Sequence, residues 1–375
     1  MEEYLELRED IYYNDIYSKG NGKGYYIIGC ISQDSQLLVK ENKIAQYKDI
    51  LKKINGENIS NLIEKGCKNE KELQKLIKLF KEKGFLKGYE NIIIFNEVNM
   101  VSLKILNIKL RSEKIWEQVI CKILINLYKY FLLVVTILVL LMYEEQKQKN
   151  EFFQALNIFG FSNTIALGTK EYIYVFLLTP IMFIFHELAH RIAGIAMGLK
   201  EGTISFVMYL GFIPMIYVKQ KGIYSLNRKD IITVICAGMA ANLLIGISLL
   251  LLYNIWHFNI LYYVAIANFR MIYINMLPIS LTDGYFLLCI LMKSPNIRMY
   301  MYKVLVNPKV ILRLERKEKI MVVCMLNSFL LITFFELFWA LTFIPLKIRM
   351  VVIFIILITY TICLNKKGKI FLQKN

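Results

Sequence analysis

The chain divides into a polar first third and a largely apolar remainder. Residues 1 to about 115 contain no apolar run long enough to cross a bilayer. Beyond them, apolar runs of spanning length occupy 119–143, 172–198, 231–253, 260–291, 320–346 and 349–364. Because a membrane-spanning helix needs about 20 mainly apolar residues, this pattern predicts a polytopic α-helical membrane protein with about six transmembrane helices.

The polar first third shows the alternating and helical patterns of a small folded domain. Two β-type runs at 25–31 and 36–39 flank a turn, which predicts a hairpin. Apolar residues at helical spacing follow in two stretches that end at Gly56 and Gly84, and a last β-type run covers 91–95. The pattern predicts a small α+β soluble domain that precedes all the spans.

This N-terminal region resembles the PqqD-like winged-helix domains, which bind leader peptides in clusters that make modified peptides. The resemblance rests on the hairpin, on a helix that ends in the turn Asn55-Gly56-Glu57, on a short helix around 59–63, and on a helix that ends at 82–86. It implies a cytoplasmic leader-binding domain at 1–95, followed by a linker at 96–118 and a membrane domain at 119–375. The alternative is a small regulatory or stabilising domain, because winged helices serve many functions.

A shorter apolar run lies between the second and third predicted spans. Residues 206–218 are β-rich, too short to cross a membrane, and broken by Gly211 and Pro214. We interpret this run as a re-entrant β-hairpin packed against protein. Such a hairpin either offers an edge to a substrate strand or serves as an interfacial loop.

Composition and charge agree with a membrane protein. Hydrophobic residues make up 57% of the chain and the mean hydropathy is +0.46. The net charge of +17 is concentrated beside the apolar runs, at 313–317 and 366–369. Positive-inside topology explains these clusters better than a nucleic-acid partner. We therefore expect a multi-pass protein of the cell membrane that binds no nucleic acid, with its N-terminal domain and C-terminal tail in the cytoplasm.

Cysteine usage and the first residues add two expected absences. The seven cysteines are scattered with no CxxC pair, which argues against a disulfide framework and against a thiolate zinc site. The chain begins with polar residues and shows no basic region followed by an apolar run, so we expect no cleavable signal peptide.

The residues with the clearest chemistry lie inside the second apolar run, at His186-Glu187-Leu188-Ala189-His190. On a helix, residues four apart share a face, so both imidazoles can reach one zinc ion while Glu187 points toward the open side of the metal. The alternative is two core histidines and a Glu187–Arg191 ion pair. Ionisable residues at a bilayer centre cost about 2.5–3.5 kcal/mol each, which favours a functional group.

A catalytic zinc ion keeps three protein ligands and one open position, so a further ligand is needed. The candidate is Asp283, because the predicted topology runs the second and fourth spans in one direction and brings Asp283 to the depth of His190. Pro278 removes a helical hydrogen bond and Gly284 permits unusual dihedral angles, so the backbone can open and aim Asp283 inward. The alternative is that Asp283 is an ordinary helix-end or turn residue.

These motifs resemble the site-2 protease family of intramembrane zinc metalloproteases, in which HExxH supplies two ligands and an N-x-x-P…D-G element supplies the third. The third run adds the segment 237–242, similar to the small-residue and asparagine helix of that family. The elements appear in family order over roughly 170–295. The chain departs from the family pattern at Met276, Thr282 and Tyr285, which bears on loop geometry and substrate fit rather than on the ligand types.

The resemblance implies an intramembrane zinc metalloendopeptidase with Zn2+ as cofactor and Glu187 as general base. Asn275 and Asn242 are candidates for contacts with the substrate or the oxyanion, and interhelical hydrogen bonds are the alternative. The favoured substrate is a membrane-associated peptide, such as a bacteriocin precursor whose leader binds the N-terminal domain. A transporter or modification enzymes are then further partners.

Two other functions remain open on this sequence. One is regulated intramembrane proteolysis of a membrane-bound signalling regulator. The other is a non-proteolytic peptide-binding or export component that retains the metal for structure.

Overall fold

The structure is a computed structural model. The residues that it describes are 4–20, 22–54, 57–58, 70–90, 102–112, 114–127, 130, 169–209, 213–278, 282–295, 297–340, 348 and 350–355. The chain forms two compact units. Unit 1 comprises Met1–Lys129 and Glu187–Gly238, and unit 2 comprises Tyr130–His186 and Met239–Asn375.

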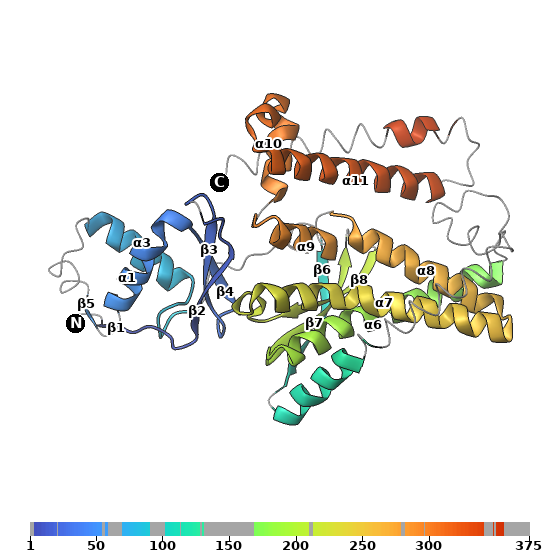
Figure 1. The fold of residues 1–375 in the computed structure, drawn as a ribbon, viewed down its shortest axis with the longest axis horizontal. Helices are drawn as coiled ribbons and strands as arrows, with labels where there is room; N and C mark the ends of the chain where they lie inside the picture. Colours follow the sequence, from blue (N-terminus) through green and yellow to red (C-terminus); the bar gives the residue numbers. More distant parts are fainter. Residues whose placement is uncertain are drawn as a thin grey trace. The chain divides into compact units, whose positions relative to one another are not determined.

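The N-terminal part of unit 1 is a three-stranded antiparallel sheet with two helices (Figure 1). Its elements are β1 (Tyr4–Leu5), β2 (Ile11–Tyr17), β3 (Tyr25–Cys30), β4 (Ser35–Lys40), α1 (Ile44–Ile54), β5 (Glu57–Asn58) and α3 (Glu70–Glu82). The strand order is β2-β3-β4, and β1 pairs with β5. The predicted hairpin is formed by β3 and β4, and the two predicted helices are α1 and α3.

Strand β2 was missed by the sequence analysis because polar residues interrupt its apolar alternation. Asn14 and Asp15 stand in the middle of the strand, where the pairing with β3 also shifts register. The short helix predicted around 59–63 and the β-type run at 91–95 lie outside the described residues.

The core of this part lies between the sheet and the two helices. Each helix buries one face at the spacing that predicted it, and Phe80 of α3 stacks on Phe85 with ring centroids 5.8 Å apart. The fully buried large side chains of this core are Leu5, Ile28, Leu51, Ile54, Phe80, Phe85 and Leu86.

A second antiparallel sheet of unit 1 has the order β6-β7-β8, and its strands are β6 (Ser102–Arg111), β7 (Glu201–Tyr209) and β8 (Ile213–Gln220). The hairpin β7–β8 covers the run 206–218, and β6 lies in the range 96–118 that was assigned to a linker. Within the described residues β8 pairs only with β7, so its other edge carries no strand. Pro214, which has no N–H to donate, is tolerated on such an edge strand.

Long helices make up most of the remaining described residues. They are α6 (Thr169–Ala196), α7 (Arg228–Trp256), α8 (Asn259–Met276), α9 (Asp283–Leu291), α10 (Ile297–Val306) and α11 (Arg316–Ala340), with 3-10 turns η2 (Ile223–Ser225) and η3 (Pro308–Arg313). Helices α6 and α7 each run through both units. In unit 2, Met182 of α6 packs with Val264 and Met271 of α8 in a small apolar core.

The prediction of about six transmembrane helices is wrong. Among the described residues, α7 alone is long and apolar enough to cross a membrane, judged by length and composition. One physical reason is visible in the run 260–291, which is not one helix: α8 ends at Met276 and α9 begins at Asp283. The length of an apolar run in the sequence does not reveal a break of this kind in the helix. Much of the runs 119–143 and 349–364 lies outside the described residues.

Candidate metal centre

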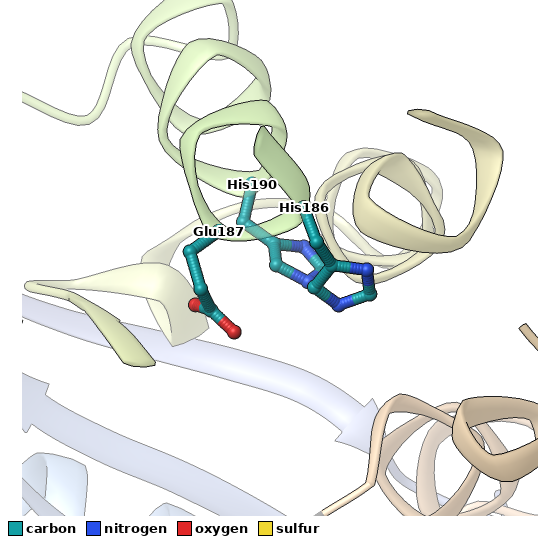
Figure 2. A group of neighbouring side chains, drawn as sticks. All are labelled: His186, Glu187 and His190. Carbon is teal, nitrogen blue, oxygen red and sulfur yellow. The ribbon is translucent and has the colours of Figure 1, made fainter. Parts of the chain in front are cut away.

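The HExxH segment is helical and brings its three potential metal-binding side chains together. His186, Glu187 and His190 lie on α6, and one ligand atom from each falls within 4.8 Å of the others. Figure 2 shows the two imidazole rings close to each other with the Glu187 carboxylate beside them. His186 is 3% exposed and His190 is 8% exposed. This buried group could hold a metal ion.

The ring of His190 is fixed by a backbone carbonyl of α7. Its Nδ1 lies 2.7 Å from the carbonyl oxygen of Val234. A carbonyl can only accept a hydrogen bond, so Nδ1 carries the proton, and in the neutral ring Nε2 then keeps its lone pair. Metal-binding histidines are oriented in this way by a second contact on the other ring nitrogen.

Both ring nitrogens of His186 also have partners in unit 2. Nε2 lies 3.2 Å from Oδ2 of Asp283, and Nδ1 lies 3.0 Å from Nδ2 of Asn242. The structure therefore brings Asp283 to His186, although 97 positions separate the two residues in the chain.

The sequence analysis considered Asn242 as a contact to the substrate or the oxyanion. In the structure, its amide lies instead against Nδ1 of the His186 ring. Asn242 is fully buried, and its Oδ1 has no hydrogen-bond partner among the described residues. Turning the amide would present Oδ1 to a protonated Nδ1 of His186. That tautomer leaves Nε2 available to a metal.

Asp283 is the first residue of α9, which a break separates from α8. The side chain of Thr282 caps α9 and also donates to the carbonyl of Leu277 at 2.6 Å. Gly284 lies so close to the end of α8 that an added Cβ would be 2.2 Å from the carbonyl oxygen of Met276 and 2.8 Å from that of Asn275. Pro278 lies in the same break, directly after Leu277, the C-cap of α8. The carbonyl of Asn275 therefore lies beside Gly284, and Asn275 as a whole is half-buried.

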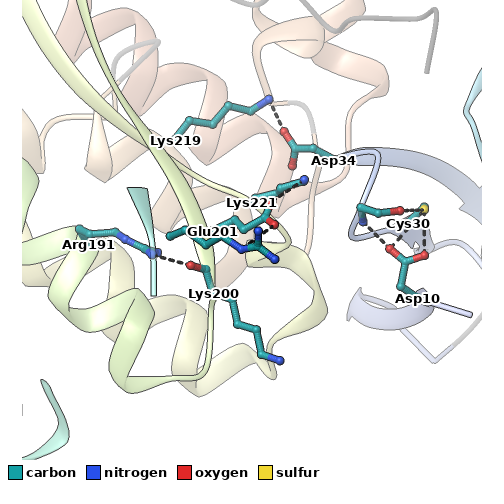
Figure 3. Close-up of polar contacts among 10 residues, drawn as sticks. Asp10, Cys30, Asp34, Arg191, Lys200, Glu201, Lys219 and Lys221 are labelled. Carbon is teal, nitrogen blue, oxygen red and sulfur yellow. Dashed lines mark hydrogen bonds and ion pairs between the residues drawn. The ribbon is translucent and has the colours of Figure 1, made fainter. Parts of the chain in front are cut away.

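Glu187 is held by the unpaired edge of β8. Its Oε2 accepts a hydrogen bond of 2.6 Å from the backbone N–H of Val218. Arg191, considered from sequence as an ion-pair partner of Glu187, instead donates to Gln220 Oε1 at 3.0 Å and to the Lys200 carbonyl at 2.8 Å, the latter drawn in Figure 3.

The contacts of Val218 and Gln220 were not found by sequence reasoning. Gln220 is 7% exposed and donates through Nε2 to the carbonyl of His190 at 2.8 Å. A single glutamine at the end of a strand carries no sequence signal for such a role. The sequence did contain a signal for strand β6, because Leu106, Ile108 and Leu110 alternate with polar residues as in a half-buried strand.

The geometry as a whole is that of a candidate metal centre. Imidazole nitrogens and carboxylate oxygens are ligand types that divalent transition metals accept, and outer contacts orient both rings. No protein-family model, no curated protein and no solved structure matches this chain.

Proposed function

We propose that this chain is a zinc-dependent metalloendopeptidase. The proposal is carried by the buried cluster of His186, Glu187 and His190 on one helix. His186, His190 and Asp283 would hold Zn2+, because nitrogen and carboxylate ligands from three residues are the usual set of a catalytic zinc site. The contact between His186 and Asp283 supports the choice of the third ligand.

The proposed chemistry divides between the metal and Glu187. A bound Zn2+ acts as a Lewis acid toward a peptide carbonyl and toward water. Glu187 takes a proton from the attacking water and delivers it to the leaving amine. Its hydrogen bond from Val218 keeps the carboxylate on the side of α6 that faces β8.

We further propose that the substrate is a membrane-associated peptide and that the protein acts at the cell membrane. Helix α7 supports this location by its length and composition. The helical residues 115–127 add large apolar side chains that are exposed, which is typical of a surface that meets lipid or a partner. These side chains are Ile115, Trp116, Val119, Ile120, Ile123, Leu124 and Leu127. Maturation of a ribosomally made peptide, with its leader bound by the N-terminal domain, is the specific form of this proposal.

Two substitutions test the enzyme function. Glu187→Gln should keep zinc and abolish cleavage, whereas His186→Ala should lose zinc as well. The purified full-length protein is reconstituted in lipid vesicles with the small peptides encoded beside its gene; products are followed by mass spectrometry and bound zinc by elemental analysis. Glu201→Gln, on β7, is the matched control and should cleave the peptides and bind zinc like wild type.

The two variants refute different parts of the proposal. Unchanged processing by Glu187→Gln would reject hydrolysis by this site. Full retention of zinc by His186→Ala would reject the assigned ligands.

A further inference from the structure

Gln220 joins the end of β8 to the helical turn of α6 that carries His190. Both ends of its side-chain amide are used: Nε2 donates to the carbonyl of His190 at 2.8 Å, and Oε1 accepts from Nη1 of Arg191 at 3.0 Å. Because the donor and the acceptor face different partners, the amide has one orientation that satisfies both. The two bonds therefore fix the side chain and the helical turn against each other.

Gly194 leaves the space that the Gln220 amide fills. A Cβ at position 194 would lie 2.6 Å from Oε1 and 2.8 Å from Nε2 of Gln220. Gly194 follows His190 by one helical turn, so it lies on the same face of α6. The Gln220 amide can therefore occupy this position only because residue 194 has no Cβ.

A second contact joins the same strand end to the catalytic candidate. Val218 precedes Gln220 by two residues, so both have the same orientation in the strand. The N–H of Val218 donates to Glu187, and the side chain of Gln220 donates to His190. Two alternate residues of β8 therefore bind the two positions of the HExxH motif that lie in unit 1.

The strand end is itself held by the N-terminal part of unit 1. Lys219, between these two residues, forms an ion pair with Asp34 in the turn between β3 and β4 (Figure 3). Just beyond the strand, the Asn14 amide donates to the carbonyls of Tyr224 at 2.7 Å and Leu226 at 2.6 Å. The anchored strand can therefore act as a fixed support for α6.

We propose that Gln220 is a positioning residue of the metal centre, which sets the rotation of the α6 turn that presents His190. This inference rests on the proposed function, because it assumes that the HExxH group binds a metal. It assigns a role to a residue that touches neither metal nor substrate. Losing such outer contacts typically weakens metal binding about 10- to 100-fold.

The test uses Co2+ as a probe, because its visible absorption reports coordination geometry as well as binding. For the full-length protein in detergent, Gln220→Ala should bind Co2+ about tenfold more weakly and show an altered spectrum. Gln220→Glu keeps an acceptor for Arg191 but cannot donate to His190, so it should weaken Co2+ binding as well. Gln36→Ala, an exposed glutamine of β4, is the matched control.

A double substitution keeps the inference testable if a variant folds poorly. Gly194→Ala alone should weaken Co2+ binding, because its Cβ displaces the Gln220 amide. In the Gln220→Ala background the same Cβ has room, so Gly194→Ala should add little, and the two effects should be non-additive.

Three results would overturn the inference. Wild-type affinity and spectrum in folded Gln220→Ala would show that Gln220 positions nothing, while the metal site stands. Simple additivity of the two substitutions would show the same. Failure of the wild-type protein to bind Co2+ or Zn2+ at all would instead overturn the proposed function and this inference with it.

Discussion

Replacing Gly284 with alanine tests whether Asp283 is held beside His186 by the close approach of α8 and α9. The new Cβ would lie 2.2 Å from the Met276 carbonyl oxygen, and its other close neighbours are also backbone atoms. Real Cβ atoms essentially never come closer than 3.0 Å to another atom, so the start of α9 and the end of α8 must move apart by about 0.8 Å. Overpacking of this kind costs about 1–3 kcal/mol.

The displacement is large on the scale of metal coordination. Ligand distances in metal sites hold within about 0.2 Å, whereas the shift falls on the residue next to Asp283. We therefore expect Gly284→Ala to lower zinc affinity at least about tenfold, measured by competition with a chelating dye, and to lower the unfolding temperature.

Gly246→Ala is the matched control for that experiment. Its Cβ would lie 3.1 Å from the ring of Phe269, a side chain that can move by a few tenths of an ångström. The control should keep wild-type zinc affinity. Wild-type zinc affinity in folded Gly284→Ala would refute the reasoning, because Asp283 would then not depend on this packing or would not be a ligand.

The outer contacts, the N-terminal core and a surface ion pair each give a further expected outcome. Asn242→Ala removes the amide 3.0 Å from the His186 ring and should lower zinc affinity about 10- to 100-fold by dye competition; unchanged affinity would mean that the amide does not orient the ring. Phe80→Ala empties a fully buried position and should cost about 3–5 kcal/mol, seen as faster hydrogen exchange in α3; exchange at the wild-type rate would contradict this. The hydrogen bond from Lys221 lowers the pKa of Glu201 below its usual 4.5. The stability that the ionised Glu201 contributes to the fold is therefore present above pH 4.5 and is lost as the pH falls through the lowered pKa. The stability deficit of Glu201→Gln, measured by denaturant unfolding, should therefore shrink between about pH 7 and about pH 3, and a deficit that grows would be contrary evidence.

The sequence predicted those parts of the site whose geometry is local or whose residue types are conspicuous. His186 and His190 are four residues apart, so helical geometry alone places them on one face. Asp283 was selected because a catalytic zinc ion needs a third protein ligand, because the predicted topology brought this carboxylate to the depth of His190, and because a glycine and a proline near it could open the backbone. The outer contacts could not be predicted in the same way, because a valine N–H and a strand glutamine are unremarkable residues.

The elements with a regular spacing of apolar residues were predicted correctly. The membrane spans, which were predicted only from the length of apolar runs, were not. The helices α1 and α3 followed from apolar spacing, and the β3–β4 hairpin followed from two short runs around a turn. The count of membrane spans failed because hydropathy does not register a helix break such as the one between Met276 and Asp283. Asp283, Pro278 and Gly284, which marked the run 260–291 as part of a candidate site, thus also indicated that this run was not one continuous helix.

The separation of contacts along the chain explains which parts of the centre needed a structure. One turn of helix places the three polar side chains of the HExxH motif on α6. The contacts that orient them join residues far apart in the sequence. The separation is 31 residues between Glu187 and Val218, 30 between His190 and Gln220, and 56 between His186 and Asn242. Each long-range contact closes a loop and so costs chain entropy that several interactions must offset together. A buried metal group therefore depends on the strand and helices around it, and substitution of Gln220 or Asn242 should weaken metal binding even though neither residue is an assigned ligand.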